Sequence, residues 1–343
     1  MRRGQRAEVS ALSVAMAIVP RVFCGLMVDT PDVHNGAYLS VLLGTLLALP
    51  AVHGLQFVAK RANPRGMRGL RLLLAAWLSL DAAALIDCTA ASAGYVAFAH
   101  VATRLLALPL LAAALRASVS GERTVVYAAN LLVRASVLLL VILIVQQLPY
   151  LRASWLAPVL GFGTRGILRA GVWTAARMTG IAGAFALLFR DCQTSDGKPR
   201  LIQGMCIASA VLVFLIVLRL MMAPSMGGDA MRRLNRLDAL LTNGRAPLYS
   251  QLPMITVWFV GTLHAICFEC CATGAMLRQS LPALKRWGSA ILSVGPVALL
   301  TLTGLWKQAL DALPAGLEYG FLLGGICLSA AAIHLQPGGR TCE

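Results

Sequence analysis

Apolar segments of about 20 residues recur along the whole chain, and their length constrains the fold more than any other feature of the sequence. A helix of about 20 apolar residues is what crosses the hydrocarbon core of a bilayer. The composition agrees, since 58% of the 343 residues are hydrophobic, 13% are charged and the mean hydropathy is +0.75. The sequence therefore predicts an all-α polytopic membrane protein.

About ten transmembrane helices are expected, and residues 1–343 are expected to form a single integral membrane domain. The first apolar run is interpreted as a retained span and not a signal peptide, because its only Ala-x-Ala-like site lies inside the run. The spans are placed near residues 9–28, 38–59, 71–96, 100–116, 124–147, 168–189, 201–222, 250–276, 287–306 and 317–335. Between the fifth and sixth, the stretch "SWLAPVLGFGTRG" is too rich in Pro and Gly for a spanning helix and is expected to cap a vestibule.

The net charge of +16 is explained by orientation in the membrane. Most Lys and Arg residues fall in connections that share one side if the N-terminus is cytoplasmic, as in "KRANPRGMRGLR". The first outer loop, "DTPDVHNG", contains neither Lys nor Arg. The positive-inside rule therefore predicts both termini in the cytoplasm, and nucleic-acid binding is not expected.

Two spans carry helix-breaking residues in their interiors. In the first span Pro20 is followed by Arg21, and the sixth contains Thr179-Gly180-Ile181-Ala182-Gly183 after Arg177. Interrupted helices at positions 1 and 6 are typical of a five-plus-five inverted repeat with broken helices 1 and 6, whose ligand site lies between the breaks. Pro kinks are also common in membrane helices for structural reasons alone. The predicted ligand-binding residues, where small side chains leave room, are Val19, Pro20, Arg21, Val22, Arg177, Thr179, Gly180, Ile181 and Gly183.

Charges inside the spans need partners, because a charge exposed to lipid costs at least a few kcal/mol. Asp81, Asp87 and Glu269 are the acidic residues concerned, and Glu269 is placed toward the inner end of its span. Structural ion pairs are one interpretation. The other is that Arg21 and Arg177, each beside a predicted break, bind the carboxylate of an amino-acid-like ligand. The candidate partners for the carboxylates are Arg104, Arg134, Arg177 and Arg219.

The remaining motifs argue against metal, cofactor and catalytic chemistry. "HAICFECC" places His and Cys at helical spacing, but structural zinc sites usually use Cys pairs on turns. The other cysteines have no framework spacing, so no disulfide is expected. No nucleotide-binding, nucleophile-elbow or metalloprotease motif is present. The sequence therefore predicts a non-enzyme without metal or cofactor.

Three stretches carry a resemblance to a known family. They are "GAYLSVLLGTLLALP" after the first outer loop, "WLAPVLGFGTRGILRAG" leading into the sixth span, and "LDALLTNGRAPLYSQLPMITVWF" entering the eighth. In their order along the chain they resemble the B subunit of nutrient germinant receptors of spore-forming bacteria. That family is a branch of the amino acid-polyamine-organocation transporter superfamily.

The resemblance implies a receptor subunit that binds a small, amino-acid-like germinant and triggers spore germination. It implies multi-pass insertion in the spore inner membrane and two partners, a membrane-bound A subunit and a lipoprotein C subunit. Two alternatives stay open. One is a secondary amino-acid transporter of the same superfamily, since one fold serves several functions. The other is a membrane scaffold whose pocket is vestigial.

Overall fold

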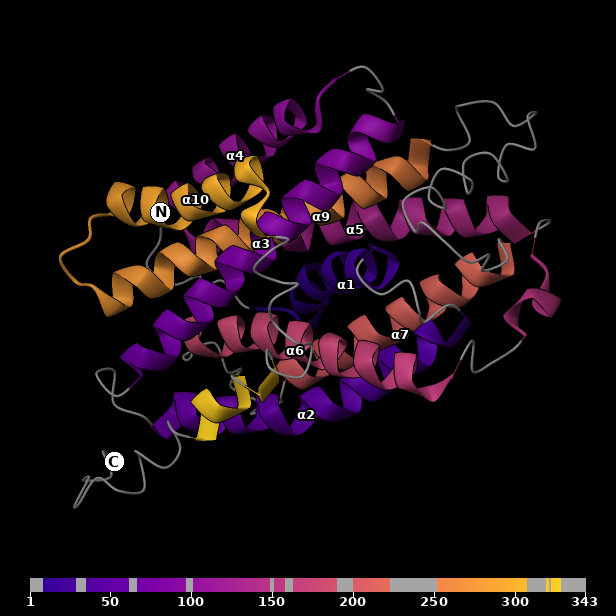
Figure 1. Cartoon of the computed structure of the whole chain (residues 1–343), viewed down its shortest axis with the longest axis horizontal. Coiled ribbons are helices and arrows are strands. Elements are labelled where there is room, and N and C mark those ends of the chain that lie inside the picture. Colours follow the sequence, from indigo (N-terminus) through magenta and orange to yellow (C-terminus); the bar gives the residue numbers. More distant parts are fainter. Residues whose placement is uncertain are drawn as a thin grey trace.

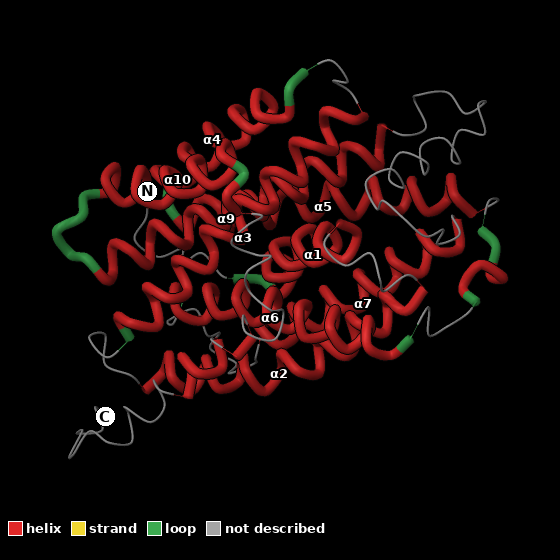
Figure 2. Tube along the Cα trace, in the orientation of Figure 1, coloured by secondary structure: helices red, strands yellow, loops and turns green. Residues whose placement is uncertain are grey.

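The described part of the chain is almost entirely helical, with a few short loops (Figure 2). The computed structural model describes residues 9–28, 35–61, 67–96, 101–148, 151–157, 163–189, 200–222, 252–306, 319–320 and 322–327, and no strand occurs among them. Seven of the described helices are long and apolar enough to cross a membrane, and Ala11–Leu26 is a shorter apolar helix. The predicted all-α, multi-span class is confirmed.

The helices follow the predicted spans to within a few residues. They are α1 (Ala11–Val28), α2 (Ala37–Arg61), α3 (Arg68–Val96), α4 (Thr103–Ser120), α5 (Glu122–Gln147), the 3-10 helix η3 (Ala153–Leu156), α6 (Thr164–Leu188), α7 (Arg200–Met222), α9 (Leu252–Ser280) and α10 (Arg286–Thr303). Residues 319–320 and 322–327 are also helical. They belong to the tenth predicted span, and the rest of that span lies outside the described residues.

The helices pack as two groups of four. We call α1, α2, α6 and α7 the first bundle, because α2 packs along α6, α1 along α7, and the two pairs contact each other. We call α3, α4, α9 and α10 the second bundle, in which every pair of helices is in contact. Figure 1 shows α2, α6 and α7 in the lower part of the view and α4, α9 and α10 in the upper part. Contacts of α1 with α9 and of α6 with α3 join the bundles.

The helix–helix contacts of the first five predicted spans are repeated by the next five. Helix α9 is the eighth predicted span and α10 the ninth. The repeat therefore pairs α1 with α6, α2 with α7, α3 with α9 and α4 with α10. The contact of α1 with α7 then becomes the contact of α6 with α2, and both are among the most extensive in the molecule. Likewise α4 packs on α9 as α10 packs on α3. This correspondence is the packing that a five-plus-five repeat requires, and because five is odd, related helices cross the membrane in opposite directions.

Two hydrophobic cores divide largely, but not completely, between the bundles. One cluster of buried apolar residues draws on α1, α2, α6, α7 and the first half of α3, and also on α5 and the second half of α9. The other draws on the second half of α3, on α4, α9 and α10, and on Cys24 of α1. Helices α3 and α9 therefore lie at the boundary, and each contributes residues to both cores.

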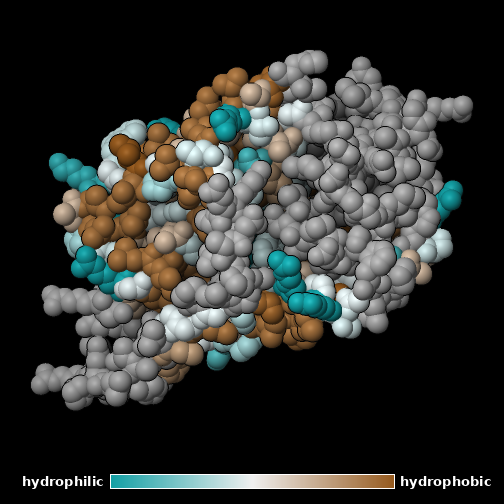
Figure 3. All heavy atoms as spheres, viewed as in Figure 1, coloured by the Kyte–Doolittle hydropathy of each residue, from teal (hydrophilic) through white to brown (hydrophobic). Residues whose placement is uncertain are grey.

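The outer helices present apolar side chains on their exposed faces. On α5 the four most exposed large apolar residues recur at intervals of four or seven, which is one face of a helix. Brown apolar side chains likewise cover much of the surface over α4 and α10 in Figure 3. An apolar face of this kind is compatible with contact with lipid tails, which are themselves apolar. On α5 it comprises Tyr127, Leu131, Leu138 and Val145, which are 60–73% exposed.

The expectation that helices 1 and 6 are broken is wrong. Helix α1 continues through Pro20, and α6 continues through Gly180 and Gly183. Pro lacks one backbone hydrogen bond, but membrane helices tolerate this where neighbouring helices pack against the site. Gly261 of α9 lies directly against the Pro20 ring, since a Cβ added there would lie 3.1 Å from Pro20 Cγ. Packing from other helices holds both segments helical.

The segment before α6 is described only at its two ends, where η3 precedes it and α6 follows. After η3, the residue Ala157 accepts a hydrogen bond from Asn35 Nδ2 at 2.9 Å, and the Arg152 amide donates to the Met221 carbonyl at 2.8 Å. Gly163, with φ of 137°, immediately precedes α6. Residues 158–162 lie outside the described part of the chain. The segment is thus tied to the start of α2 and the end of α7, and its role as a vestibule cap stays a prediction.

Candidate functional site

Two buried arginines and a buried aspartate meet where the bundles join. Arg21 on α1, Arg177 on α6 and Asp81 on α3 are each 1% exposed. Arg21 Nε donates a hydrogen bond to Asp81 Oδ1 at 2.7 Å, and Arg21 Nη2 lies at the same distance from that oxygen. Arg177 Nε forms an ion pair with the same oxygen at 2.9 Å. One carboxylate oxygen therefore faces guanidinium groups from two helices.

Two tryptophans enclose the arginine side chains. The Arg177 guanidinium carbon lies 4.8 Å from the centre of the Trp173 ring and 5.1 Å from the centre of the Trp77 ring. The Arg21 guanidinium carbon lies 5.3 Å from the centre of the Trp173 ring. These are cation–π distances, and in a site without water such contacts contribute about 2 kcal/mol. The indole rings therefore stabilise the two cations and exclude solvent from the ion pair.

Glu269 belongs to the same cluster, so its predicted position toward the inner end of its span is wrong. Its side chain on α9 is 0% exposed. The neighbouring charges that act on it are those of Asp81, Arg21 and Arg177. Helix α9 packs along α3, and this packing brings two residues far apart in sequence together.

The four charges divide between the bundles by sign. Both cations, Arg21 and Arg177, are on the first bundle, while both carboxyls, Asp81 and Glu269, are on the second. The exchange that relates α1 to α6 also relates the helices of the two cations, and it likewise relates α3 to α9, the helices of the two carboxyls. With all four groups ionised the cluster is neutral, as a buried cluster needs to be. The junction between the bundles is therefore electrostatically complementary.

The other predicted ligand residues line the same two helices, but the glycines do not leave open space. A Cβ on Gly180 would lie 2.1 Å from the Trp77 ring, and one on Gly183 would lie 3.0 Å from Leu55 Cδ1. Because these glycines have no side chains, α3 and α2 pack closely against α6. The prediction that the glycines leave room for a ligand is therefore wrong. The buried Thr179 Oγ1 has no hydrogen-bond partner among the described residues.

The three remaining predicted residues are apolar. Val22 and Ile181 are fully buried, and the partly buried Val19 packs against the core of the first bundle. None of the three is part of the charged cluster. Pro20 is also buried, and it contacts α9 through Gly261. Contact of any of the nine predicted residues with a ligand stays a prediction.

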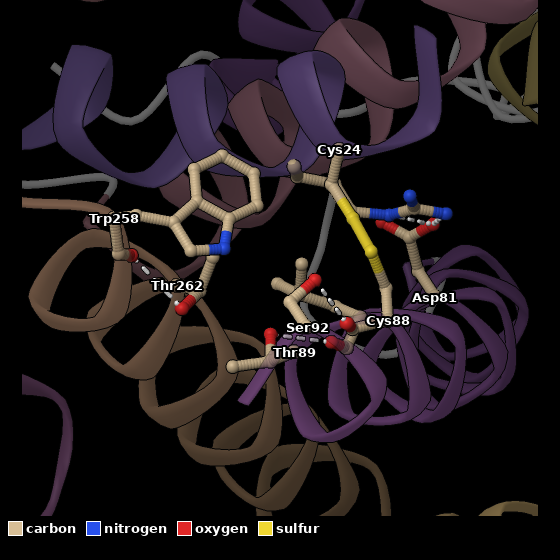
Figure 4. The surroundings of a disulfide bond; sticks show 9 residues. Cys24, Asp81, Cys88, Thr89, Ser92, Trp258 and Thr262 are labelled. Atoms are coloured by element: carbon tan, nitrogen blue, oxygen red, sulfur yellow. Dashed lines mark hydrogen bonds and ion pairs between the residues drawn. A yellow bond between two sulfur atoms is a disulfide. The ribbon is translucent and has the colours of Figure 1, made fainter. Parts of the chain in front are cut away.

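The expectation of no disulfide is also wrong. Cys24 on α1 and Cys88 on α3 are bonded across 64 residues of sequence. Figure 4 shows the bond linking the two helices beside the Asp81 carboxylate. Sequence spacing could not predict this pair, since neither cysteine lies in a recurring motif and the contact depends on how α1 and α3 pack. The bond is a covalent link between the two bundles.

One sequence signal for the site was overlooked. Trp77 precedes Asp81 by four residues, and Trp173 precedes Arg177 by four. Residues four apart share one face of a helix, so each charge is accompanied by an aromatic ring on the same side. An aromatic residue one turn before an intramembrane charge indicates a charge that faces other helices and not lipid.

Comparison with known proteins identifies the fold. No protein-family model and no curated protein matches this sequence. Mhp1, a nucleobase-cation-symport-1 family transporter solved in a closed conformation with bromovinylhydantoin bound, matches with a TM-score of 0.58 at 15% identity. A variant of the manganese transporter of Eremococcus coleocola matches with a TM-score of 0.54 at 12% identity. Each match covers 95% of this chain and 76% of the other. The chain therefore has the fold of multi-span transporters.

Proposed function

We propose that this protein is a secondary transporter that binds a small, amino-acid-like solute where the two bundles meet. In this proposal Arg21 and Arg177 hold the carboxylate of the solute. The fold shared with Mhp1 and the manganese transporter supports transport. The buried arginine pair supports a solute that carries a carboxylate, because guanidinium groups match that anion in both charge and geometry.

The observation that carries the proposal is the position of Asp81. Its Oδ1 accepts from Arg21 and pairs with Arg177, with N–O distances of 2.7 and 2.9 Å. A solute carboxylate would make the same contacts. In the absence of solute, Asp81 thus acts as an internal substitute that pairs with both arginines within the membrane, where an unpaired charge is costly.

Exchange of Asp81 for a solute would change how the bundles are held together. The arginines belong to the first bundle and Asp81 to the second. When a solute carboxylate takes the arginines, the ion pair that joins the bundles is replaced by a contact within the first bundle. Solute binding then favours a different relative position of the bundles, which is the differential affinity that a conformational change requires. Thr179 is proposed as a further polar contact for the solute.

The proposal is tested by uptake into liposomes that contain the purified chain. Each radiolabelled L-amino acid is offered in turn, and at least one is expected to accumulate. Arg21→Gln and Arg177→Gln should lower its uptake by at least about tenfold, since each removes a charged hydrogen-bond partner. Arg177→Lys should fall between, because it keeps the charge but loses the planar fork.

Arg134→Gln is the matched control, because Arg134 is exposed on α5 and lies away from the cluster. Its uptake should equal that of the unmodified chain. Melting curves of all variants separate loss of uptake from loss of folding. Uptake that is unchanged in folded Arg21→Gln and Arg177→Gln would contradict the role of the two arginines.

The germinant receptor is the second candidate, and the continuity of α1 and α6 favours it. Unbroken helices offer fewer free backbone carbonyls to a coupled metal ion than broken ones. In this proposal the chain lies in the spore inner membrane with both termini cytoplasmic. It binds an amino-acid-like germinant and signals to an A subunit and a lipoprotein C subunit. Saturable binding of an amino acid without accumulation in liposomes, together with co-purification of both partners from spores, would decide for the receptor.

A further inference from the structure

We propose that the outward face of α5 is the docking surface for a membrane-spanning helix of another protein, and that this helix carries a carboxylate near its midpoint. The inference does not depend on the proposed transport of a solute. It follows from an exposed arginine in the middle of α5, from the spacing of the apolar residues around it, and from the lack of an acid to pair with it.

Arg134 is an exposed charge in the middle of a membrane-spanning helix. It lies near the midpoint of α5 (Glu122–Gln147), about three turns from either end, and its side chain is exposed. A charge at this depth is costly in lipid, and long basic side chains reach the polar interface only from near the ends of a helix. Lipid tails alone therefore do not suit this position.

The other charges in the described spans avoid this situation. Arg21, Arg177, Asp81 and Glu269 are inside the molecule and at most 1% exposed. The exposed arginines of α4 lie near the two ends of that helix. Among the described residues, Arg134 is thus the exposed charge that lies farthest from both ends of its span.

The apolar residues around Arg134 have the spacing of a helix-packing stripe. Along the centre of the exposed face, six residues follow one another at alternating intervals of four and three. This is the spacing of residues through which two helices pack along each other, and one polar residue within such a stripe fixes the register of the pair. The stripe comprises Tyr127, Leu131, Arg134, Leu138, Val141 and Val145, and its five apolar members are 51–73% exposed.

The dimensions of the stripe and its border also fit a membrane-spanning helix. From Tyr127 to Val145 the stripe is about 27 Å long, close to the hydrocarbon thickness of about 30 Å. Ala128 and Ala135, seven residues apart beside the stripe, are both exposed. Small residues let a second helix approach closely and are enriched where membrane helices meet.

No described residue supplies the acid that Arg134 needs. No hydrogen bond or ion pair of Arg134 is found in the part of the chain that the structure describes. Helices α1, α4 and α9 pack on α5. The first two contain no carboxylate, and Glu269 of α9 is 0% exposed. Glu122, at the start of α5, is paired with Arg278.

A second copy of this chain does not fit the surface. A symmetric contact through the same face would bring the Arg134 residues of two copies together, and like charges repel. Contact with another face would need an exposed carboxylate within a span. Among the described residues Asp81 and Glu269 are buried, while Asp87 is partly buried and has its own partner. The charge therefore calls for a different protein with its own intramembrane carboxylate.

The test uses the purified full chain in phosphatidylcholine vesicles with two synthetic membrane-spanning helices. Both probes are Leu- and Ala-rich with Lys at each end, and they differ only in a central Glu or Gln. A photo-crosslinking amino acid in place of Leu138, one turn beyond Arg134, reports contact with α5. Crosslinking to the Glu probe should exceed that to the Gln probe by about tenfold, since a polar contact between helices is strengthened in the membrane.

Two matched controls locate the effect. Arg134→Gln should reduce the preference for the Glu probe to about one, whereas Arg123→Gln, the same change at the inner end of α5, should leave it unchanged. The crosslinker in place of Leu299 on α10, which is 61% exposed against 63% for Leu138, should show no preference. Equal crosslinking of both probes at Leu138 would overturn the proposal. So would loss of the preference in vesicles of phosphatidylglycerol, because the anionic lipid would then satisfy Arg134.

Crosslinking in the membranes of the organism that encodes the chain identifies the natural partner. The adduct at Leu138 should contain a peptide from a membrane span with an Asp or Glu in its interior, and its yield should fall in Arg134→Gln. An adduct with a second copy of the chain, with a span that lacks a carboxylate, or with lipid alone would overturn the proposal.

Unfolding of the purified chain excludes a partner within the chain itself. Arg134→Gln and Arg123→Gln should have the same denaturation midpoint in detergent micelles. A lower midpoint in Arg134→Gln alone would mean that Arg134 is paired inside the molecule and would overturn the docking surface. The liposomes of the uptake assay contain no partner protein, so failure of the docking proposal leaves the transport proposal untouched.

Discussion

The first and second bundles have matching helix packing but opposite charges at their junction. Each contributes two buried ionisable residues from helices that correspond under the five-span exchange. In the first bundle both are arginines that contact tryptophan rings, whereas in the second both are carboxyls. Neither bundle is neutral at this surface alone. The association of the bundles therefore depends on charge as well as on apolar packing.

The comparison also shows why an apolar composition is not enough to describe such a chain. Helix α5 contacts the bundles on one side, and 22% of the residues in its most apolar 18-residue stretch are buried, against 83% in the corresponding stretch of α6. Both are long enough to span a membrane, yet α5 exposes large apolar residues and α6 buries glycines, a threonine and an arginine. Small and charged residues mark the helices that contact other helices.

The largest effect is expected from removing the carboxylate that both arginines contact. Asp81→Asn leaves Arg21 and Arg177 as buried cations without their shared anion. The free energy of unfolding should fall by about 3–5 kcal/mol, the usual cost of breaking a buried ion pair on one side. Denaturant unfolding in detergent micelles measures it. The double variant Asp81→Asn with Arg177→Met should regain part of the loss, and a loss that is simply additive would contradict the shared contact.

Loss of the covalent link between the bundles should have the next largest effect. Changing Cys24 and Cys88 together to Ser should lower the free energy of unfolding by about 2 kcal/mol. This is the low end of the usual range, because helices that persist in a membrane limit the entropy that the unfolded chain can gain. Thiol labelling of the unmodified chain with and without reductant should differ at these two cysteines. Equal labelling would mean that the bond does not form.

A smaller loss is expected where α6 and α3 approach most closely. Gly180→Ala places a methyl group against Trp77 and should cost about 1–3 kcal/mol through overpacking. The matched control is Gly295→Ala on α10, where a Cβ meets nothing within 4 Å. That substitution should be neutral or slightly stabilising, because Ala has the higher helix propensity. Melting temperatures of the two variants test the contrast, which fails if both fall equally.

The smallest effect is expected at the ion pair away from the junction. Glu122 on α5 lies 3.3 Å from Arg278 on α9, and their side chains are 30% and 33% exposed. Partly exposed pairs contribute at most about 1 kcal/mol. Glu122→Gln should therefore change the free energy of unfolding by less than this. A loss as large as that of Asp81→Asn would show that the burial of the central cluster is not what makes it important.

Sequence reasoning reached the fold through local signals, and it reached only part of the site. Span length and the order of polar connections predicted the helices, because each span is a local property of about 20 residues. Arg21 and Arg177 were found because charges inside spans are conspicuous. Arg177 was among the predicted partners of the carboxylates, and its ion pair with Asp81 is confirmed. The choice of Asp81, the second contact from Arg21 and the place of Glu269 beside them were not predictable, because they depend on which helices pack together.

The errors share one physical cause. Pro20, Gly180 and Gly183 were interpreted from intrinsic helix propensity, yet contacts from α9, α3 and α2 determine their conformation. The cysteines were judged by their spacing along the sequence, although the disulfide depends on their distance in space. Local rules therefore fail at the positions where the bundles meet.

The bond between Cys24 and Cys88 limits how the two bundles can move relative to each other. Any motion of one bundle against the other that leaves the bond intact is close to a rotation about this point. Arg21 lies one helical turn from Cys24, about 5 Å away, while the start of α1 is 13 residues away, or about 20 Å. A rotation of about 10° would displace Arg21 by less than about 1 Å and the start of α1 by about 3 Å. The charged cluster lies close to this centre of rotation, so a small displacement of the cluster accompanies a larger displacement at the start of α1.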